Sequence, residues 1–307
     1  MTRRSNAPVH AESLAGFRAD RDMTMTPRDT PWEGSDERSD RGYADLGNAA
    51  VGREAVLSSR RRQLVAAAAT SCGPCHRDNE DSHSALEGSQ SLFVVADGVG
   101  GGALAAWASH ELVAQLHAKL GSAAPDPDSI RAALIEADRT IGERIVALGH
   151  AAGAATVALC KGVDAAFSRW LIAWVGDCRI YRLSEGDGRV DAELVTRDDS
   201  YRNLDEQPPS GASPDDPARM VGNGAISTIN VRDFDLAAGG MLVLCSDGVH
   251  KHVMPADIRR VLVEAATLAA GCRQLIDHAR NGGSRDDATV MAIQRLRRDQ
   301  IQPEGST

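Results

Sequence analysis

Short apolar runs rich in β-branched residues recur along the chain after residue 60 and are separated by more polar stretches. The run 93–96 is typical of a buried strand, because its β-forming residues lead directly into glycines that allow the chain to turn. The three runs between residues 156 and 183 predict an antiparallel meander. Together with 93–96, the predicted strands are 62–68, 156–160, 170–175, 179–183, 225–234, 241–245 and 288–293.

Helical periodicity is found in four other stretches. The stretch 103–120 is followed by Gly121, a residue that suits the C′ position of a helix. From Ser129, interpreted as an N-cap, apolar residues recur on one helical face to about residue 148. Two later helices are predicted at 255–268 and 272–280. Because helices lie early and late with hairpin-spaced strands between them, the pattern predicts an α+β domain. The apolar face of the second helix comprises Ile130, Ala133, Leu134, Ala137, Ile141 and Ile145.

The first 60 residues have a different composition, rich in Arg, Asp, Ser, Gly and Pro, and no sustained apolar period. Such a segment cannot bury enough apolar surface to offset the conformational entropy of the chain. We therefore expect a disordered N-terminal extension at 1–60, one globular domain at 61–298 and a short tail at 299–307. A docking or regulatory role of the extension is an alternative interpretation.

The composition narrows the class of protein. With 307 residues and 42% hydrophobic residues, the chain can bury a full core. No apolar run approaches the roughly 18–20 residues of a membrane helix, and no secretory signal is recognisable at the N-terminus. A net charge of −9 argues against nucleic acid as the main partner. Six cysteines without an export signal indicate reduced thiols, so we expect a cytoplasmic protein without membrane or nucleic-acid partners.

Carboxylates recur at the ends of the predicted strands. Three apolar runs lead into Asp97, Asp177 and Asp247, and Asp286 directly precedes the last strand. In an antiparallel sheet the end of one strand lies beside the start of its neighbour. We therefore expect these carboxylates to meet at one edge, joined by Asp81 from a preceding loop.

Clustered carboxylates either have strongly raised pKa values or bind cations. An all-oxygen ligand set without paired His or Cys residues selects hard divalent ions such as Mg²⁺ or Mn²⁺. Gly98 would also let a backbone carbonyl approach such an ion. A single Asp-Gly pair is more typical of a turn, but three carboxylates in matched contexts, together with Asp286, favour a metal site.

The motifs also occur in a characteristic order over about residues 64–295. They are Asn79-Glu80-Asp81, Ala96-Asp97-Gly98-Val99-Gly100-Gly101, Gly153-Ala154-Ala155-Thr156, Val175-Gly176-Asp177, Cys245-Ser246-Asp247-Gly248 and Gly283-Ser284-Arg285-Asp286-Asp287. This series resembles the bacterial branch of the PP2C-type (PPM) metal-dependent protein serine/threonine phosphatases. The resemblance implies an αββα sandwich of two antiparallel β-sheets flanked by helices, with a dinuclear metal site at one end.

The resemblance also implies roles for individual residues. Asp97 matches the carboxylate that bridges both metals, and Gly98 matches the carbonyl ligand. Asp247 and Asp286 match the remaining side-chain ligands of the second metal. The implied cofactors are two Mn²⁺ or Mg²⁺ ions, and the implied chemistry is attack of a metal-activated water on phosphorus, for which Asp97, Asp247 and Asp286 are the catalytic candidates.

The resemblance also assigns roles near the metal ions to three further acidic residues. Glu80 and Asp81 match residues that hold water molecules of the metal shell. Asp177 matches the ligand of a third, weaker metal in bacterial members. Together with the preceding ligands, they complete the predicted metal site.

The sequence departs from the family pattern at several positions. Bacterial members usually carry an Arg at the position of His76, where it binds the substrate phosphate, and Arg77 follows one place later. His76 and Arg77 are thus the candidate phosphate-binding residues, although a one-residue shift on a strand reverses the side chain. A His that is often proposed as general acid is replaced by Gly102 at the bacterial position and by Val99 at the eukaryotic one. Asp287 stands where Asn usually follows the last ligand.

Two functions follow from these observations. The first is hydrolysis of phosphoserine and phosphothreonine in phosphorylated proteins, among them a Ser/Thr kinase or its substrates. The second is a catalytically weak or inactive relative of the same fold that binds phosphoproteins as a regulator. A missing general acid costs typically 10²–10⁴-fold in rate, so its absence slows turnover without abolishing it, and the first function is favoured.

A third hypothesis rests on Cys72 and Cys75. Their C-G-P-C-H string matches both the c-type haem attachment motif and the thioredoxin redox motif. Haem attachment requires export, and a thioredoxin motif opens a helix, whereas the residues that follow here are polar and turn-like. We therefore disfavour a redox or haem protein, and a reversible disulfide beside His76 and Arg77 remains an alternative.

Overall fold

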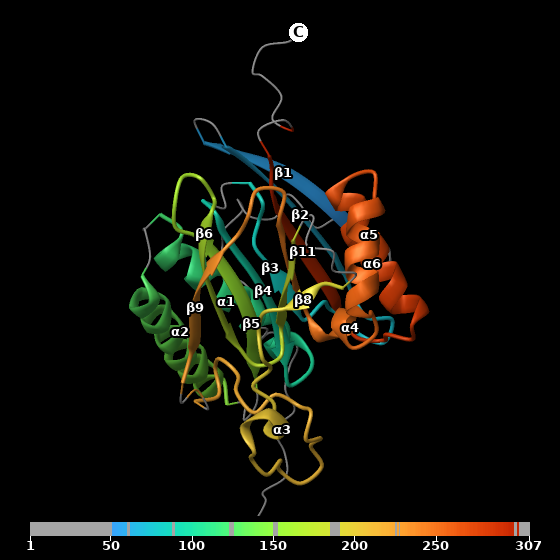
Figure 1. Ribbon diagram of the computed structural model, residues 1–307. Helices are drawn as coiled ribbons and strands as arrows, with labels where there is room; N and C mark the ends of the chain where they lie inside the picture. Colours follow the sequence, from blue (N-terminus) through green and yellow to red (C-terminus); the bar gives the residue numbers. More distant parts are fainter. Residues whose placement is uncertain are drawn as a thin grey trace, which may run out of the picture. The chain divides into compact units, whose positions relative to one another are not determined.

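The computed structural model describes residues 51–59, 62–87, 90–122, 126–149, 153–184, 191–224, 226, 228–297 and 300. These residues form two antiparallel β-sheets packed face to face, with helices on both outer faces (Figure 1). The predicted αββα sandwich is thereby confirmed. Residues 1–50 and 301–307, which belong to the predicted extension and tail, lie outside the described residues.

Sheet A has six strands in the order β1-β2-β11-β10-β7-β8, and sheet B has five in the order β3-β4-β5-β6-β9. The strands of sheet A are β1 (Val51–Ser59), β2 (Arg62–Ser71), β7 (Arg179–Leu183), β8 (Glu193–Leu194), β10 (Met241–Cys245) and β11 (Ala288–Arg295). Those of sheet B are β3 (Asp81–His83), β4 (Leu92–Val99), β5 (Ala154–Gly162), β6 (Arg169–Val175) and β9 (Asn230–Asp235).

Two pairs of helices cover the outer faces of the sandwich (Figure 1). Helices α1 (Ala103–Leu120) and α2 (Pro127–Ala147) pack on sheet B, and α5 (Pro255–Glu264) and α6 (Leu268–Asn281) pack on sheet A. Two short helices, α3 (Tyr201–Leu204) and α4 (Asp247–His250), lie in the connections. In the described residues, no helix is both long and apolar enough to cross a membrane.

Both faces of the central strands are buried, which explains their uninterrupted apolar sequences. In β4, Val94 packs toward the helices of sheet B while Phe93 and Val95 pack toward sheet A. The ring centroids of Phe93 and Trp170 lie 6.1 Å apart in the layer between the sheets. A strand covered on both faces does not alternate between apolar and polar residues, because neither side meets water.

The predicted helices agree closely with the structure for α1 and the buried face of α2, and less well for the N-cap of α2 and the bounds of α5 and α6. Helix α1 has the predicted bounds, and the predicted apolar face of α2 is the buried one. The N-cap of α2 is Asp126 and not Ser129, because the Asp126 carboxylate accepts a hydrogen bond from the Ser129 N–H and Pro127 starts the first turn. The predicted helix 255–268 is shorter, since α5 ends at Glu264 and Leu268 begins α6.

Two expectations about strands are wrong. The ordered domain begins by Val51, because β1 lies inside the stretch assigned to the disordered extension and pairs along its whole length with β2. The predicted meander does not continue beyond β6. The chain crosses to the other sheet after Val175, where β7 pairs with β10 and β8.

The buried layer between the sheets predicts where the fold is sensitive to truncation. Leu242, on β10, is fully buried between the sheets, whereas Ile135 on α2 is 58% exposed. We expect Leu242→Ala to lower the free energy of unfolding by about 2–5 kcal/mol, and Ile135→Ala to change it by less than about 0.5 kcal/mol. Urea denaturation of both variants measures this difference, and equal midpoints would contradict the packing described.

Candidate metal centre

A cavity of about 540 Å³ lies at one end of the sandwich, and carboxylates from both sheets line it. Asp97 lies near the end of β4, whereas Asp247 follows β10 and Asp286 precedes β11. Because β10 and β11 are antiparallel neighbours, the end of one lies beside the start of the other. Of the residues predicted for the site, His76, Glu80, Asp97, Gly98, Asp177, Asp247 and Asp286 line this cavity.

Asp81 lies beside this group, directly opposite Asp97 in the pairing of β3 with β4. The residue is 4% exposed, and its Oδ2 accepts a hydrogen bond of 2.7 Å from the hydroxyl of Ser246, which directly follows β10 of the other sheet. Its Oδ1 is buried without a hydrogen-bond partner. A buried carboxylate oxygen without a donor is unfavourable, so this oxygen marks a place where a cation or its water shell would fit.

The carboxylates strongly influence one another. Burial raises the pKa of Asp97 well above its ordinary value, and the charges of Asp81 and Asp247 raise it further. Burial also raises the pKa of Asp177 to about 7, with a further contribution from Asp247. Burial and Asp247 raise the pKa of Asp286 as well. These groups cannot all be ionised at neutral pH unless positive charge is present among them.

Gly98 connects the strand that carries Asp97 to the loop before β3 and to α1. Its N–H donates to the Glu80 carbonyl, which also accepts from the Ser109 hydroxyl. A Cβ at position 98 would lie 2.3 Å from the Ala105 carbonyl oxygen, so no other residue fits. The Glu80 carboxylate in turn accepts a hydrogen bond from the Gly102 N–H, just before α1 begins.

The two candidate phosphate-binding residues differ in position. His76 lines the cavity, whereas Arg77 is exposed and is not among the lining residues. The His76 Nδ1 lies 3.1 Å from an Asp287 carboxylate oxygen, and its Nε2 lies 3.9 Å from Asp286. Two of the departures from the family pattern, at positions 76 and 287, therefore form one contact pair.

Asp287 also organises the surrounding loops. Its two carboxylate oxygens accept hydrogen bonds of 2.6 Å from the N–H groups of Gly73 and Glu80. The nearby Asp287 carboxylate is the main reason that the pKa of His76 is raised. Asp287 thus fixes the loop before β3 and lies against the imidazole that faces the cavity.

Lys251 is a site residue that sequence reasoning missed. It follows α4, and its Nζ lies 2.5 Å from the Asp247 carboxylate and 3.8 Å from that of Asp177. Burial by itself would raise the pKa of Asp247, but the Lys251 ammonium holds it below its ordinary value. The i,i+4 spacing from Asp247 was the signal that could have indicated this contact.

The C-G-P-C-H string has no thioredoxin-like geometry. Residues 73–76 form a turn closed by a hydrogen bond from the His76 N–H to the Gly73 carbonyl, and no helix begins there. Burial, together with Asp287, raises the pKa of the Cys72 thiol to about 11. A redox-active cysteine of this motif has a lowered pKa, so Cys72 lacks the expected activation.

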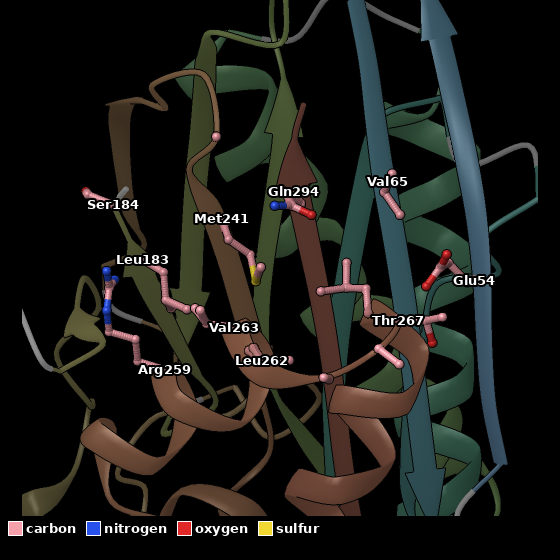
Figure 2. Close-up of a pocket in the computed structure, with 14 residues that line it drawn as sticks. Glu54, Val65, Leu183, Ser184, Met241, Arg259, Leu262, Val263, Thr267 and Gln294 are labelled. Atoms are coloured by element: carbon pink, nitrogen blue, oxygen red, sulfur yellow. The ribbon is translucent and has the colours of Figure 1, made fainter. Parts of the chain in front are cut away.

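A second cavity, of about 390 Å³, lies where sheet A meets α5 and α6 (Figure 2). Figure 2 shows Val65 and Met241 from the sheet and Leu262 from α5 among its lining side chains. It contains none of the predicted site residues. Its acidic side chain, Glu54, accepts a hydrogen bond from the Ala269 N–H near the start of α6, which gives this carboxylate a structural role.

Comparisons with known proteins agree with this geometry. The family model described as Stage II sporulation protein E (SpoIIE) matches residues 87–296. A search of curated proteins found no match. The chain belongs to the SpoIIE family, and its predicted relation to the PP2C-type phosphatases is confirmed.

Several solved structures share the fold. MsPP, a PPM Ser-Thr phosphatase from Mycobacterium smegmatis in complex with cacodylate, is 25% identical, with a TM-score of 0.62 over 76% of this chain and 98% of its own. The catalytic domain of the serine threonine protein phosphatase PstP, in complex with 2 manganese ions, is 24% identical with a TM-score of 0.64 over 76% and 99%. PppA of Pseudomonas aeruginosa, described as a key regulatory component of T6SS, is 23% identical with a TM-score of 0.65 over 76% and 98%.

The close packing at Gly98 generates a prediction. Gly98→Ala places a methyl group against the Ala105 carbonyl, so we expect a loss of about 1–3 kcal/mol or more in the free energy of unfolding. As a control, Gly149→Ala adds a methyl group that meets nothing within 4 Å and is expected to cost only about 1 kcal/mol of left-handed strain. Thermal unfolding checks both variants, and equal effects would contradict the assigned packing.

Proposed function

We propose that this protein is a metal-dependent phosphatase that hydrolyses phosphoserine and phosphothreonine in proteins. The observation that carries the proposal is the convergence of Asp97, Asp177, Asp247 and Asp286 on one cavity. Membership of the SpoIIE family and the fold shared with PPM phosphatases support it. The substrates proposed are phosphorylated proteins, including a Ser/Thr kinase or its targets, and the cytoplasmic location stays a prediction.

The donor set suits two Mn²⁺ or Mg²⁺ ions. The proposed ligands are the carboxylates of Asp97, Asp247 and Asp286 and the backbone carbonyl of Gly98. Glu80 and Asp81 would hold the surrounding water, and the unpartnered Asp81 Oδ1 supports this role. Oxygen-only donors select hard divalent ions, and a manganese-bound PstP structure has the same fold. When bound, such ions supply charge neutralisation and activation of water.

His76 and Asp287 are proposed to bind and orient the substrate phosphate. The His76 Nδ1 lies 3.1 Å from an Asp287 carboxylate oxygen, and Nε2 is the ring nitrogen proposed to contact an oxygen of the substrate phosphate. Asp287 keeps the ring oriented through its hydrogen bonds to Gly73 and Glu80. A phosphate held by His76 would lie beside Asp286, one of the proposed metal ligands, in the same cavity.

The alternative function is a phosphoprotein-binding regulator with little turnover. It is supported by Val99 and Gly102, which provide no side-chain acid at the positions where the family carries one. The described function of PppA as a regulatory component is compatible with this fold. We favour the enzyme, because the proposed metal ligands are all present.

The decisive experiment measures Mn²⁺-stimulated hydrolysis of para-nitrophenyl phosphate and of a phosphothreonine peptide. We expect Asp247→Asn to reduce kcat/KM by roughly 100-fold or more, because a metal ligand is lost. Asp233→Asn, an exposed carboxylate on β9 that pairs with Arg169, is the control and should retain wild-type activity. Phosphopeptide binding by the wild type without Mn²⁺-dependent turnover would instead support the regulator.

A second prediction separates the two phosphate-binding candidates. His76→Ala should raise KM for the phosphopeptide about tenfold, because one hydrogen bond to a charged group is lost. His76→Arg should restore much of this loss, since a guanidinium can bind both a carboxylate and a phosphate. Arg77→Ala should change KM less than twofold, because its side chain lies outside the cavity. A larger effect at Arg77 than at His76 would reverse the assignment.

A further inference from the structure

We propose that Lys251 is a built-in cation that takes the place of a third metal ion beside Asp177, so that this site binds two ions and not three. The inference rests on the proposed function, because it concerns the same cavity. The resemblance to bacterial phosphatases assigns Asp177 to a third, weaker metal. In this chain the Lys251 ammonium lies 3.8 Å from the Asp177 carboxylate.

The geometry of Lys251 supports this assignment. Its Nζ lies within 4 Å of carboxylate oxygens of both Asp247 and Asp177. Asp177 is only 4% exposed in its side chain, so its carboxylate needs positive charge from inside the cavity. A divalent ion bound between these two carboxylates would have to displace the ammonium or accept a like charge beside it.

The backbone of Asp177 is fixed independently of its carboxylate. The His250 Nε2 donates a hydrogen bond of 2.9 Å to the Asp177 carbonyl oxygen. His250 is buried and contacts the Asp177 backbone. His250 therefore positions the Asp177 main chain, while the ammonium beside the Asp177 carboxylate is that of Lys251.

The choice of lysine is itself informative. The chain contains 34 Lys and Arg residues, of which only three, Lys119, Lys161 and Lys251, are lysines. An ammonium is a compact point charge with three donors, whereas a guanidinium is a planar fork suited to one carboxylate or phosphate. A compact cation between two carboxylates resembles a small metal ion more closely than a guanidinium does.

Two basic side chains line the cavity, and they lie in opposite parts of the carboxylate group. His76 contacts Asp286 and Asp287, whereas Lys251 contacts Asp177 and Asp247. Asp97 and the buried Asp81, in sheet B, contact neither of them within the ion-pair distances found among the described residues. The two metal ions are therefore expected around Asp97, away from Asp177.

The test is a count of bound metal on the full chain, by equilibrium dialysis against Mn²⁺ and elemental analysis. We expect two ions per chain in the wild type and three in Lys251→Asp, with the third bound at least tenfold more tightly than any third ion in the wild type. Lys119→Asp, which removes a surface lysine paired with Glu136, is the matched control and should keep two ions. Three ions in the wild type, or two in Lys251→Asp, would overturn the inference.

A second variant keeps the test decisive if Lys251→Asp fails to fold. Asp177→Asn in the wild-type background should retain two ions with unchanged affinity, because its carboxylate faces Lys251 and not a metal. Loss of an ion from Asp177→Asn would overturn the inference. A raised KM for phosphopeptide in Lys251→Met with unchanged ion binding would also overturn it, because the ammonium would then hold the phosphate. A wild type that binds no Mn²⁺ would refute the proposed function itself.

Discussion

The structure depends on the stabilisation of buried carboxylates that lie close together at one end of two packed sheets. Asp81 and Asp97 face each other across β3 and β4, and like charges directly opposite are unfavourable in a sheet. Burial makes the repulsion stronger, because the surrounding protein screens charge poorly. The Ser246 hydroxyl satisfies one oxygen of Asp81 from the opposite sheet and leaves the other unsatisfied. The remaining compensation comes from protonation of a carboxyl group or from cations.

Basic side chains of the protein itself lie among these carboxylates. His76 and Asp287 form a contact pair on one side of the cavity, and Lys251 bridges carboxylates on the other. Each of these residues is also held by the fold: Asp287 through two backbone N–H groups, and Lys251 by its place directly after α4. The departures at positions 76 and 287 are therefore physically linked to each other and need not be read as isolated losses.

The fold itself does not decide between catalysis and regulation. The same sandwich is found in PPM Ser-Thr phosphatases and in PppA, described as a regulatory component. A shared scaffold positions the ends of β4, β10 and β11, whereas activity depends on the side chains placed there. In this chain the proposed metal ligands are complete, and the groups that bind phosphate and donate a proton are the ones that differ.

The sequence by itself determined the bounds of α1, the buried face of α2 and the carboxylates at strand ends, because these depend on local periodicity and on neighbouring residues. It could not assign β7 to the sheet opposite β6, because strands covered on both faces carry no polar face that would indicate their partner. It also missed β1 and the role of Lys251. Only the tertiary structure decided these features, since strand pairing and charge compensation join residues that are distant in the chain.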